Sequence, residues 1–284
     1  MIKLSAFADE SDKTLKGQIA ALKRNNISYI ELRWIADKNV ANLTVEEANA
    51  YAEEFEKEGI KVWAIGSPIG KIKLSEDFEA HKKRLRHVCK LAKIFGTDKI
   101  RMFSFFETED QAEEVYARLS EMVSIATEEN VVLYHENEKF IFGDKVDKIL
   151  GIMKNVQGLK YIYDPANYIE VGEDMDKALD TLHQKTDYFH IKDVIRETGE
   201  LVPAGHGDGK IIELIKRIGD TNVVLSVEPH LAIFDAFAYV DGTKMKNKYK
   251  FNSNVEAFDA AVSALKKLLI EAGYKECGDG FMKA

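Results

Sequence analysis

Three carboxylates and one imidazole stand where short apolar runs of this sequence end. Glu136 closes VVLYHE, Asp164 follows LKYIY, His190 lies in TDYFHIKD and Glu228 follows VVLSV. Runs of this composition are typical of buried parallel strands, where a charged side chain is an unusual core residue. Clustered carboxylates repel one another unless a cation compensates them, and a mixed oxygen and nitrogen set suits Mn²⁺, Mg²⁺, Co²⁺ or Zn²⁺. The residue types therefore indicate ligands that converge on one divalent ion.

Such convergence needs a scaffold, and the chain alternates short apolar runs with amphipathic ones almost from end to end. Eight candidate strands cover residues 2–7, 27–34, 60–65, 99–105, 131–136, 159–163, 188–192 and 223–227. Helical patterns lie between them, for example Val115, Leu119, Met122 and Ala126, or Val255, Phe258, Val262, Leu265 and Leu269. Strands separated by helices run parallel. The pattern predicts an α/β protein, with a single (β/α)₈ TIM barrel over residues 1–284.

Two other architectures are compatible with the length of 284 residues. Two ordinary domains would fit, although α/β barrels commonly use about 250 residues in one domain, and no Gly/Ser-rich linker divides the chain. An open doubly wound sheet usually has a glycine-rich phosphate turn after its first strand, where this chain has SAFADESDK. The barrel is preferred. The C-terminal ends of its strands meet at one mouth, where Glu136, Asp164, His190 and Glu228 would then lie together.

Composition is that of a soluble globular protein, with 45% hydrophobic and 31% charged residues. A net charge of −8 argues against a general binder of nucleic acid or membrane surfaces, since such partners attract basic faces. Cys89 and Cys277 lack CxxC spacing, so neither a disulfide framework nor a zinc ribbon is indicated. No run suits export or reaches the roughly 18 apolar residues of a membrane span. We expect a cytoplasmic protein, with homo-oligomerisation left open.

The same segments resemble a known family. HEN at 135–137, DPAN at 164–167, FHIKD at 189–193 and VEPH at 227–230 are similar, in order, spacing and strand context, to the metal-ligand stations of the xylose isomerase-like TIM barrels. The resemblance covers nearly the whole chain and is strongest to the sugar isomerase and epimerase branch. It implies one divalent metal ion, Mn²⁺ by preference, held by Glu136, Asp164, His190 and Glu228. Glu136 and Glu228 would also be the catalytic acid/base pair.

The implied chemistry is proton transfer next to the carbonyl of a small ketose or a related polyol ketone. Inverting one carbon, or moving a proton to its neighbour, requires groups on both sides of the substrate, and a metal ion stabilises the enediolate. Four further residues are predicted to bind substrate. Arg196 stands at a spacing resembling that of the substrate arginine of ketose epimerases, although it could equally be a solvated loop arginine. Asn167 offers an amide, and Lys192 follows the ligand histidine, which it could support unless it points into the helical layer.

Glu31, the fourth of these residues, closes YIE in the second strand. It could bind a substrate hydroxyl, orient His190, or form a buried pair with Arg33 or Arg101. His135 and His230 neighbour the ligand glutamates, and because adjacent strand residues face opposite sides, both are expected to point away from the site.

Two loops near the predicted mouth could contribute to function. PAGHGDGK at 203–210 could bind phosphate at a helix N-terminus or could simply be a flexible turn. The long segment 231–254 follows Glu228 and is expected to act as a lid or to contact a neighbouring subunit. Its aromatic residues are predicted to be packed; they are Phe234, Phe237, Tyr239, Tyr249 and Phe251.

Other functions remain compatible with this barrel. One departure from ketose 3-epimerases is Asn167, where those enzymes have a histidine. An inosose dehydratase-like lyase would use a similar ligand set, with loss of water after proton abstraction. An endonuclease IV-like phosphodiesterase needs several more histidines, whereas His81, His87 and His183 lie in predicted helices. A sugar-binding barrel without activity would not need paired glutamates.

Overall fold

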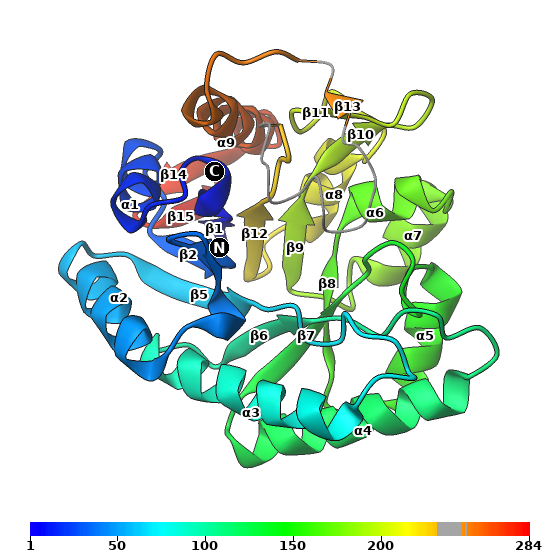
Figure 1. Cartoon of the computed structure of the whole chain (residues 1–284). Coiled ribbons are helices and arrows are strands. Elements are labelled where there is room, and N and C mark those ends of the chain that lie inside the picture. Colours follow the sequence, from blue (N-terminus) through cyan, green and yellow to red (C-terminus); the bar gives the residue numbers. More distant parts are fainter. Residues whose placement is uncertain (232–245, 248) are drawn as a thin grey trace.

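In the computed structural model, parallel strands close into a barrel that helices surround (Figure 1). The structure describes residues 1–231, 246–247 and 249–284. The barrel strands are β1 (Ile2–Ala6), β2 (Tyr29–Leu32), β5 (Lys61–Gly66), β6 (Lys99–Met102), β7 (Val132–Glu136), β8 (Lys160–Tyr163), β9 (Tyr188–Ile191) and β12 (Val223–Val227). Neighbours in this list are hydrogen-bonded in parallel, and β12 pairs with β1 to close the ring. The predicted (β/α)₈ barrel is confirmed.

Two strands end two or more residues earlier than the sequence pattern predicts. The pattern extends to residue 34 in the second strand, but after Leu32 the chain forms a ribbon of β3 (Trp34–Ile35) and β4 (Lys38–Asn39). The fourth strand was expected to reach residue 105. The backbone N–H groups of Phe103 and Phe105 donate instead to the carbonyls of Ile69 and Gly70, in the loop after β5. Apolar composition continues past the end of the barrel in both places because these loops are themselves buried.

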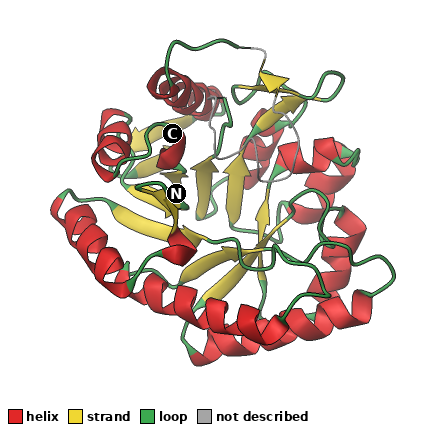
Figure 2. Ribbon diagram, in the orientation of Figure 1, coloured by secondary structure: helices red, strands yellow, loops and turns green. Residues whose placement is uncertain are grey.

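The helices form an outer layer around the strands (Figure 2). Over the described residues they are α1 (Leu15–Arg24), α2 (Val45–Lys57), α3 (Phe78–Ile94), α4 (Ala112–Glu128), α5 (Val146–Asn155), α6 (Pro165–Glu170), α7 (Met175–Leu182), α8 (Ile211–Ile218) and α9 (Asn254–Glu271). The predicted apolar face of α4 is buried throughout. In α9 the predicted face is buried except for Val255, which is 37% exposed in the first turn. Among the described residues, none of these helices could cross a bilayer.

The barrel interior explains how the fold positions charged side chains. Tyr134, Ile162, Tyr188 and Val224 pack together with Ala64 inside the ring. Side chains on one face of a strand recur every second residue. Two residues beyond Tyr134, Ile162 and Tyr188 stand Glu136, Asp164 and His190, and Glu228 stands four beyond Val224. An apolar floor therefore lies beneath a charged layer at the C-terminal ends of the strands.

Smaller elements complete the chain at both ends of the barrel. The 3₁₀ helices η1 (Ala8–Glu10) and η2 (Val40–Asn42) follow β1 and β4, while the hairpin of β14 (Tyr274–Cys277) and β15 (Gly280–Lys283) pairs antiparallel with β1. A second small sheet joins β10 (Asp193–Ile195), β11 (Glu200–Val202) and β13 (Lys246–Asn247).

The predicted lid falls largely outside the described residues. Phe234, Phe237 and Tyr239 lie there, so their packing stays a prediction. Phe251 packs against the hydrophobic core, and the Tyr249 hydroxyl lies 2.9 Å from Nδ1 of His206. The described end of this segment is therefore attached to the body of the protein, and β13 makes part of it a strand.

One prediction for the fold concerns pH. His81 of α3 is buried, and its Nε2 accepts a hydrogen bond from the backbone N–H of Gly70 at 2.9 Å. Burial, with a smaller effect from Arg84, lowers the pKa of His81 from 6.5 to about 4. Below about pH 6.5 the unfolded chain takes up this proton before the folded one, so stability is present above that pH and is lost as pH falls toward 4. The free energy of unfolding falls by about 3 kcal/mol in total, because a difference of one pKa unit between the folded and unfolded states corresponds to about 1.36 kcal/mol.

The variant His81→Gln keeps an acceptor for Gly70 but does not titrate. Urea unfolding at pH 7 and pH 4.5 should show a smaller loss of stability for this variant than for the wild type. Equal losses in the two proteins would contradict the role assigned to His81.

Candidate metal centre

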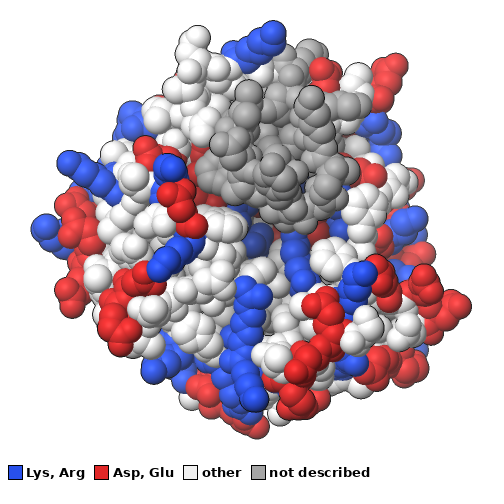
Figure 3. All heavy atoms as spheres, in the orientation of Figure 1, with Lys and Arg blue, Asp and Glu red and all other residues white. Residues whose placement is uncertain are grey.

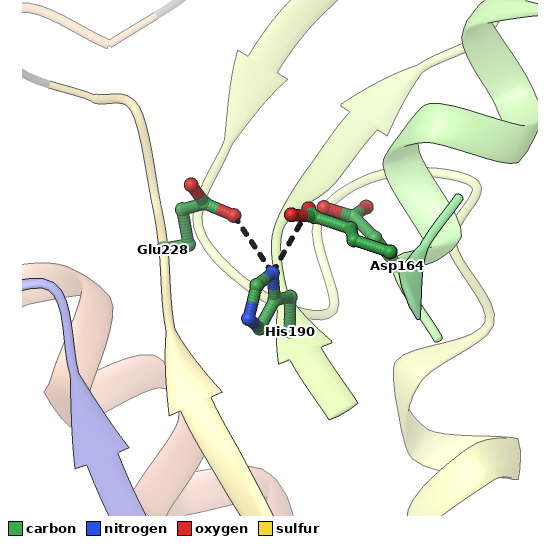
Figure 4. A group of neighbouring side chains, drawn as sticks. Asp164, His190 and Glu228 are labelled. Atoms are coloured by element: carbon green, nitrogen blue, oxygen red, sulfur yellow. Dashed lines mark hydrogen bonds and ion pairs between the residues drawn. The ribbon is translucent and has the colours of Figure 1, made fainter. Parts of the chain in front are cut away.

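Glu136, Asp164, His190 and Glu228 meet at the mouth of the barrel. Glu136 is the last residue of β7, His190 lies in β9, and Asp164 and Glu228 directly follow β8 and β12. All four side chains are buried, and one donor atom of each lies within 4.8 Å of the others. Asp164 and Glu228 flank His190 in Figure 4. The fold therefore brings together the residues that the sequence singled out, across almost 100 positions of the chain.

The sequence around Asp164 fixes where its carboxylate lies. Asp164 is the N-cap of α6, and its Oδ1 accepts the backbone N–H of Asn167 at 3.1 Å, with Pro165 at the start of the helix. Asn137 ties the ends of β7 and β8 together, because its amide donates to the carbonyl of Asp164 and accepts that residue's N–H, at 2.9 and 2.8 Å. The HEN and DPAN segments thus include residues that shape the site, besides its candidate ligands.

His190 links three carboxylates through its two ring nitrogens. Nδ1 lies 2.9 Å from Oε1 of Glu136 and 3.1 Å from Oε2 of Glu228, and Nε2 lies 2.9 Å from Oε2 of Glu31. Burial lowers the pKa of His190, but the charges of Glu31, Glu136 and Glu228 outweigh burial and raise it well above its ordinary value. Since a metal ion displaces protons from its ligands, the proton favoured on Nδ1 marks the place that a cation would take.

Glu31 contacts His190, which is the contact that the orienting role considered for it requires. Its Oε2 also accepts hydrogen bonds from the hydroxyls of Tyr188 and Ser226, the latter at 3.0 Å. Its Oε1 lies 4.0 Å from Nε of Arg101, at the limit of an ion pair. A carboxylate that receives the second ring N–H of a ligating histidine is a common support of metal sites.

We expect Glu31→Gln to bind a divalent ion about 10- to 100-fold more weakly than the wild type, the usual effect of losing such a support. Calorimetric titration with Mn²⁺ measures the affinity without any substrate. Glu213→Gln, on the exposed side of α8, is the control and should keep wild-type affinity. An affinity of Glu31→Gln within threefold of the wild type would remove Glu31 from this role.

Each of the two glutamates has an arginine of its own. Nη1 of Arg101 lies 3.1 Å from Oε2 of Glu136, and Nη1 of Arg33 lies 2.8 Å from Oε1 of Glu228. The ring of Phe7 contacts both arginines, with centroid distances of 4.3 Å to Cζ of Arg33 and 5.3 Å to Cζ of Arg101. The arginines therefore hold one oxygen of each glutamate, and the other oxygen faces His190.

Nearby positive charges keep both glutamates ionised. Burial would raise the pKa of Glu136, but His190 and Arg101 outweigh burial and hold it below its ordinary value. For Glu228 the effect of burial is outweighed by Lys192 and His190, and the pKa falls well below the ordinary value. Both side chains are thus carboxylates, the form that accepts a proton or binds a metal ion.

Lys192 and Asn167, both predicted to bind substrate, lie against Asp164. Nζ of Lys192 is 2.9 Å from Oδ2 of Asp164 and 2.9 Å from Oδ1 of Asn167. Nδ2 of Asn167 lies 3.5 Å from Oε1 of Glu136. Burial raises the pKa of Asp164 to about 6, against the opposing charge of Lys192. The structure places an ammonium group and an amide beside the candidate ligands.

The site also fits a cation in its unsatisfied oxygens. Oδ2 of Asp164 and Oε2 of Glu228 are buried and accept no hydrogen bond from the described residues. Each lies at ion-pair distance from a basic group, Lys192 and His190 respectively. Buried carboxylate oxygens without hydrogen bonds are costly unless a positive charge compensates them. The three carboxylates and one imidazole therefore suit a divalent ion, as their chemistry predicted.

Arg196 is not brought to this cluster. After Lys192 the chain turns into the hairpin of β10 and β11, and Arg196 is exposed near its tip. Its Nη2 donates to the carbonyl of Glu173 at 2.9 Å, and its backbone N–H donates to Oδ2 of Asp208 at 2.7 Å. Sequence spacing from His190 could not reveal the hairpin that carries this arginine away.

The glycine-rich loop 203–210 encloses a carboxylate of the chain itself. The backbone N–H groups of Gly205, Gly207 and Gly209 donate to the carboxylate of Asp193 at 2.9, 3.0 and 2.9 Å. A Cβ atom on Gly207 would lie 2.4 Å from Oδ1 of Asp193, so the loop needs glycine there. The phosphate that we considered for this loop would meet donors already in use and a negative charge. The loop instead fixes the chain after His190.

Sequence reasoning missed a second charged group beside Glu228. Asp9 and Glu10 of η1 contact Arg33 at 2.9 and 3.2 Å. The expectation that His230 points away was wrong, since its Nε2 lies 3.5 Å from Oε1 of Glu228. His230 is two residues from Glu228, so the alternation that turns an immediate neighbour such as His135 away does not turn His230 away, and β12 has already ended at Val227. Asp9 and Glu10 stand three and four residues after the end of β1, in a 3₁₀ helix, so they do not close the strand as the candidate ligands do.

Other described histidines contact groups outside the four-residue cluster. His81 and His87 belong to α3, and His183 caps the end of α7. His135 faces outward from β7, where its Nε2 lies 2.8 Å from the hydroxyl of Ser104. Among the described histidines, His190 and His230 are the ones within ion-pair distance of Glu228. This distribution does not match a centre that several histidines supply.

Comparison with known proteins supports the fold. A family model described as xylose isomerase-like TIM barrel matches residues 19–248. No curated protein sequence matches the chain.

Three solved structures illustrate the likeness. The first is a probable 3-DHS dehydratase involved in petrobactin synthesis from Bacillus anthracis, with 18% identity and a TM-score of 0.71 over 93% of this chain and 98% of that chain. The second is an L-ribulose 3-epimerase, with 17% identity and a TM-score of 0.72 over 96% of each chain. The third is the IOLI protein with a zinc atom, with 18% identity and a TM-score of 0.72 over 95% of this chain and 99% of that chain. At these identities the likeness shows a shared fold.

Proposed function

The chain belongs to the xylose isomerase-like TIM barrel family, and on that premise we propose that it is a divalent-metal-dependent sugar isomerase or epimerase. Its substrate would be a small ketose or a related polyol ketone, and Mn²⁺ the preferred ion. The observation that carries the proposal is the convergence of Glu136, Asp164, His190 and Glu228 within 4.8 Å at the barrel mouth. The folds shared with an L-ribulose 3-epimerase and with a zinc-containing protein are consistent with it.

The chemistry divides between the ion and the protein. A divalent ion held by the four side chains would bind the carbonyl and hydroxyl oxygens of the substrate and stabilise the charge that develops when the adjacent proton leaves. Oε1 of Glu136 and Oε2 of Glu228 both face Nδ1 of His190. The two glutamates stand at the ends of β7 and β12, which β8 and β9 separate in the barrel. One glutamate would remove the proton from the substrate carbon, and the other, after taking up a proton from solvent water, would deliver it to the substrate from its own side.

The remaining residues would bind and orient the substrate. Asp164 and His190 would mainly hold the ion, and Glu31 would keep His190 in register. The amide of Asn167 and the ammonium group of Lys192 lie 2.9 Å apart beside Asp164, where both could donate to sugar oxygens. Glu136 is kept ionised mainly by His190 and Arg101, and Glu228 mainly by Lys192 and His190, so either could accept a proton.

Proton exchange with solvent tests the reaction before the substrate is known. The protein loaded with Mn²⁺ is incubated with a panel of ketoses and cyclic polyol ketones in D₂O. Deuterium should appear at the carbon next to the carbonyl in at least one of them. A panel without deuterium incorporation, in protein shown to hold one ion, would count against proton transfer while leaving the metal site standing.

A dehydratase is the second candidate, and Lys192 is the observation that favours it. Its ammonium group is buried beside Asp164, and a dehydration needs a group that can protonate a departing hydroxyl. The fold is shared with a probable 3-DHS dehydratase. The same incubations separate the candidates, because dehydration lowers the product mass by one water, whereas isomerisation and epimerisation leave the mass unchanged apart from deuterium.

A further inference from the structure

Arg33 gathers three buried carboxylates on one side of the candidate centre. Its Nε and Nη2 lie 2.9 and 3.2 Å from the two oxygens of Asp9. Nη2 also lies 3.2 Å from Oε1 of Glu10, and Nη1 lies 2.8 Å from Oε1 of Glu228. Arg33 and its three partners are all nearly inaccessible to solvent. This guanidinium is therefore a fixed positive charge surrounded by negative ones.

His230 approaches two of the same oxygens. Its Nε2 lies 3.4 Å from Oε1 of Glu10 and 3.5 Å from Oε1 of Glu228, and its backbone N–H donates to Oε2 of Glu10 at 2.7 Å. Donor atoms of Glu10, Glu228 and His230 lie within 4.8 Å of one another. Two carboxylates and an imidazole at this separation form a ligand set for a divalent ion. Glu228 belongs both to this set and to the four-residue cluster.

The set and the arginine compete for the same lone pairs. An ion bound by Glu10, Glu228 and His230 would need the Oε1 atoms that Arg33 now holds. We infer that Arg33 is a built-in cation that stands in the place of a second metal ion and restricts the centre to one ion. This inference rests on the proposed function, because it takes Glu136, Asp164, His190 and Glu228 to be the first metal site.

Arg101 provides a contrast within the same site. It holds Glu136 much as Arg33 holds Glu228, but its other neighbours are the carbonyl of Ser67, at 3.5 Å, and Glu31, at 4.0 Å. Glu31 already accepts hydrogen bonds from Tyr188, His190 and Ser226. Removing Arg101 would therefore not assemble a new ligand set, whereas removing Arg33 would leave Asp9, Glu10, Glu228 and His230 around one position.

Metal content distinguishes these cases without an assay of activity. Bound Mn²⁺ per chain is measured by elemental analysis after equilibrium dialysis at saturating Mn²⁺. The wild type and Arg101→Met should hold no more than one ion, and Arg33→Met should hold two. Adding His230→Ala to Arg33→Met should return the count to one. Paramagnetic resonance should show a coupled pair of Mn²⁺ ions in Arg33→Met alone.

Three outcomes would overturn the inference: two ions in the wild type, one ion in folded Arg33→Met, or two ions in Arg101→Met. Absence of any ion from the wild type would refute the proposed metal site itself, which is a different result. Removing Arg33 leaves buried carboxylates without their partner, which is strongly destabilising. Because a second ion would compensate these carboxylates, adding Mn²⁺ should raise the melting temperature of Arg33→Met more than that of the wild type. If it does not fold even with Mn²⁺, the count in the milder variant Arg33→Gln, again two, decides.

Discussion

Replacing either Glu136 or Glu228 with glutamine should reduce turnover by about 10²- to 10⁴-fold, which is the usual contribution of general acid/base catalysis. Glutamine keeps the shape of the side chain and an oxygen for Arg101 or Arg33, but its amide cannot accept the substrate proton. Both glutamates are buried and ionised in the structure, so the substitution removes a charge that the site is built to hold. The rate of deuterium incorporation into the substrate is the measurement.

The two variants must be compared at equal metal content, because both residues are also candidate ligands. Mn²⁺ is therefore titrated to saturation in each variant before the rate is measured. Glu213→Gln serves as the control, since Glu213 faces solvent on α8 and should leave the rate unchanged. A loss smaller than tenfold in both variants, with the ion bound, would take proton transfer away from the two glutamates.

The candidate ligands could be found from sequence because the signal was local. Each of Glu136, Asp164, His190 and Glu228 interrupts or closes an apolar run that is long enough to identify a strand. Strand alternation then decides which face they occupy, and the barrel decides that those faces meet. Nothing beyond neighbouring residues and one topological inference was needed.

The partners of these ligands depend on contacts between distant parts of the chain. Arg33 lies 195 positions from Glu228, and no pattern near either residue indicates that they meet. Asp9 and Glu10 follow β1 within a 3₁₀ helix, so they were not identified as closing a strand. The arginines and carboxylates that set the charge of the site therefore appear only once the barrel has closed.

Backbone direction after the strands was the other feature hidden from the sequence. His230 returns to the site through a positive φ, and Arg196 leaves it on the β10–β11 hairpin. Asp193, next to the ligand region, binds a glycine loop that was considered for phosphate. Loops at the mouth of a barrel vary without disturbing the strands. Acidic and basic side chains are interspersed over the face in Figure 3, which is why overall charge is a poor guide to individual pairs there.

Adding a divalent ion to metal-stripped protein should raise its melting temperature by about 5 °C or more. Saturation at 100 times the dissociation constant stabilises the folded state by about 2.7 kcal/mol, and each kcal/mol shifts the melting temperature of a chain of this size by roughly 2 to 4 °C. The physical cause is the burial of Glu136, Asp164 and Glu228 around His190, where a dication adds to the compensation that His190, Lys192 and the arginines provide.

Asp164→Asn is the matched variant for this experiment. Its amide oxygen can still accept the N–H of Asn167 and cap α6, but it offers a much weaker ligand at the place of Oδ2. We expect this variant to lose most of the metal-dependent shift, and Glu213→Gln to keep all of it. Scanning calorimetry with Mn²⁺, Mg²⁺, Co²⁺ and Zn²⁺ in turn would rank the ions by the size of the shift. A wild-type shift that is absent with every ion, or equal in Asp164→Asn, would mean that the four side chains form an ion-pair network closed by His190 and Lys192, without a metal ion at its centre.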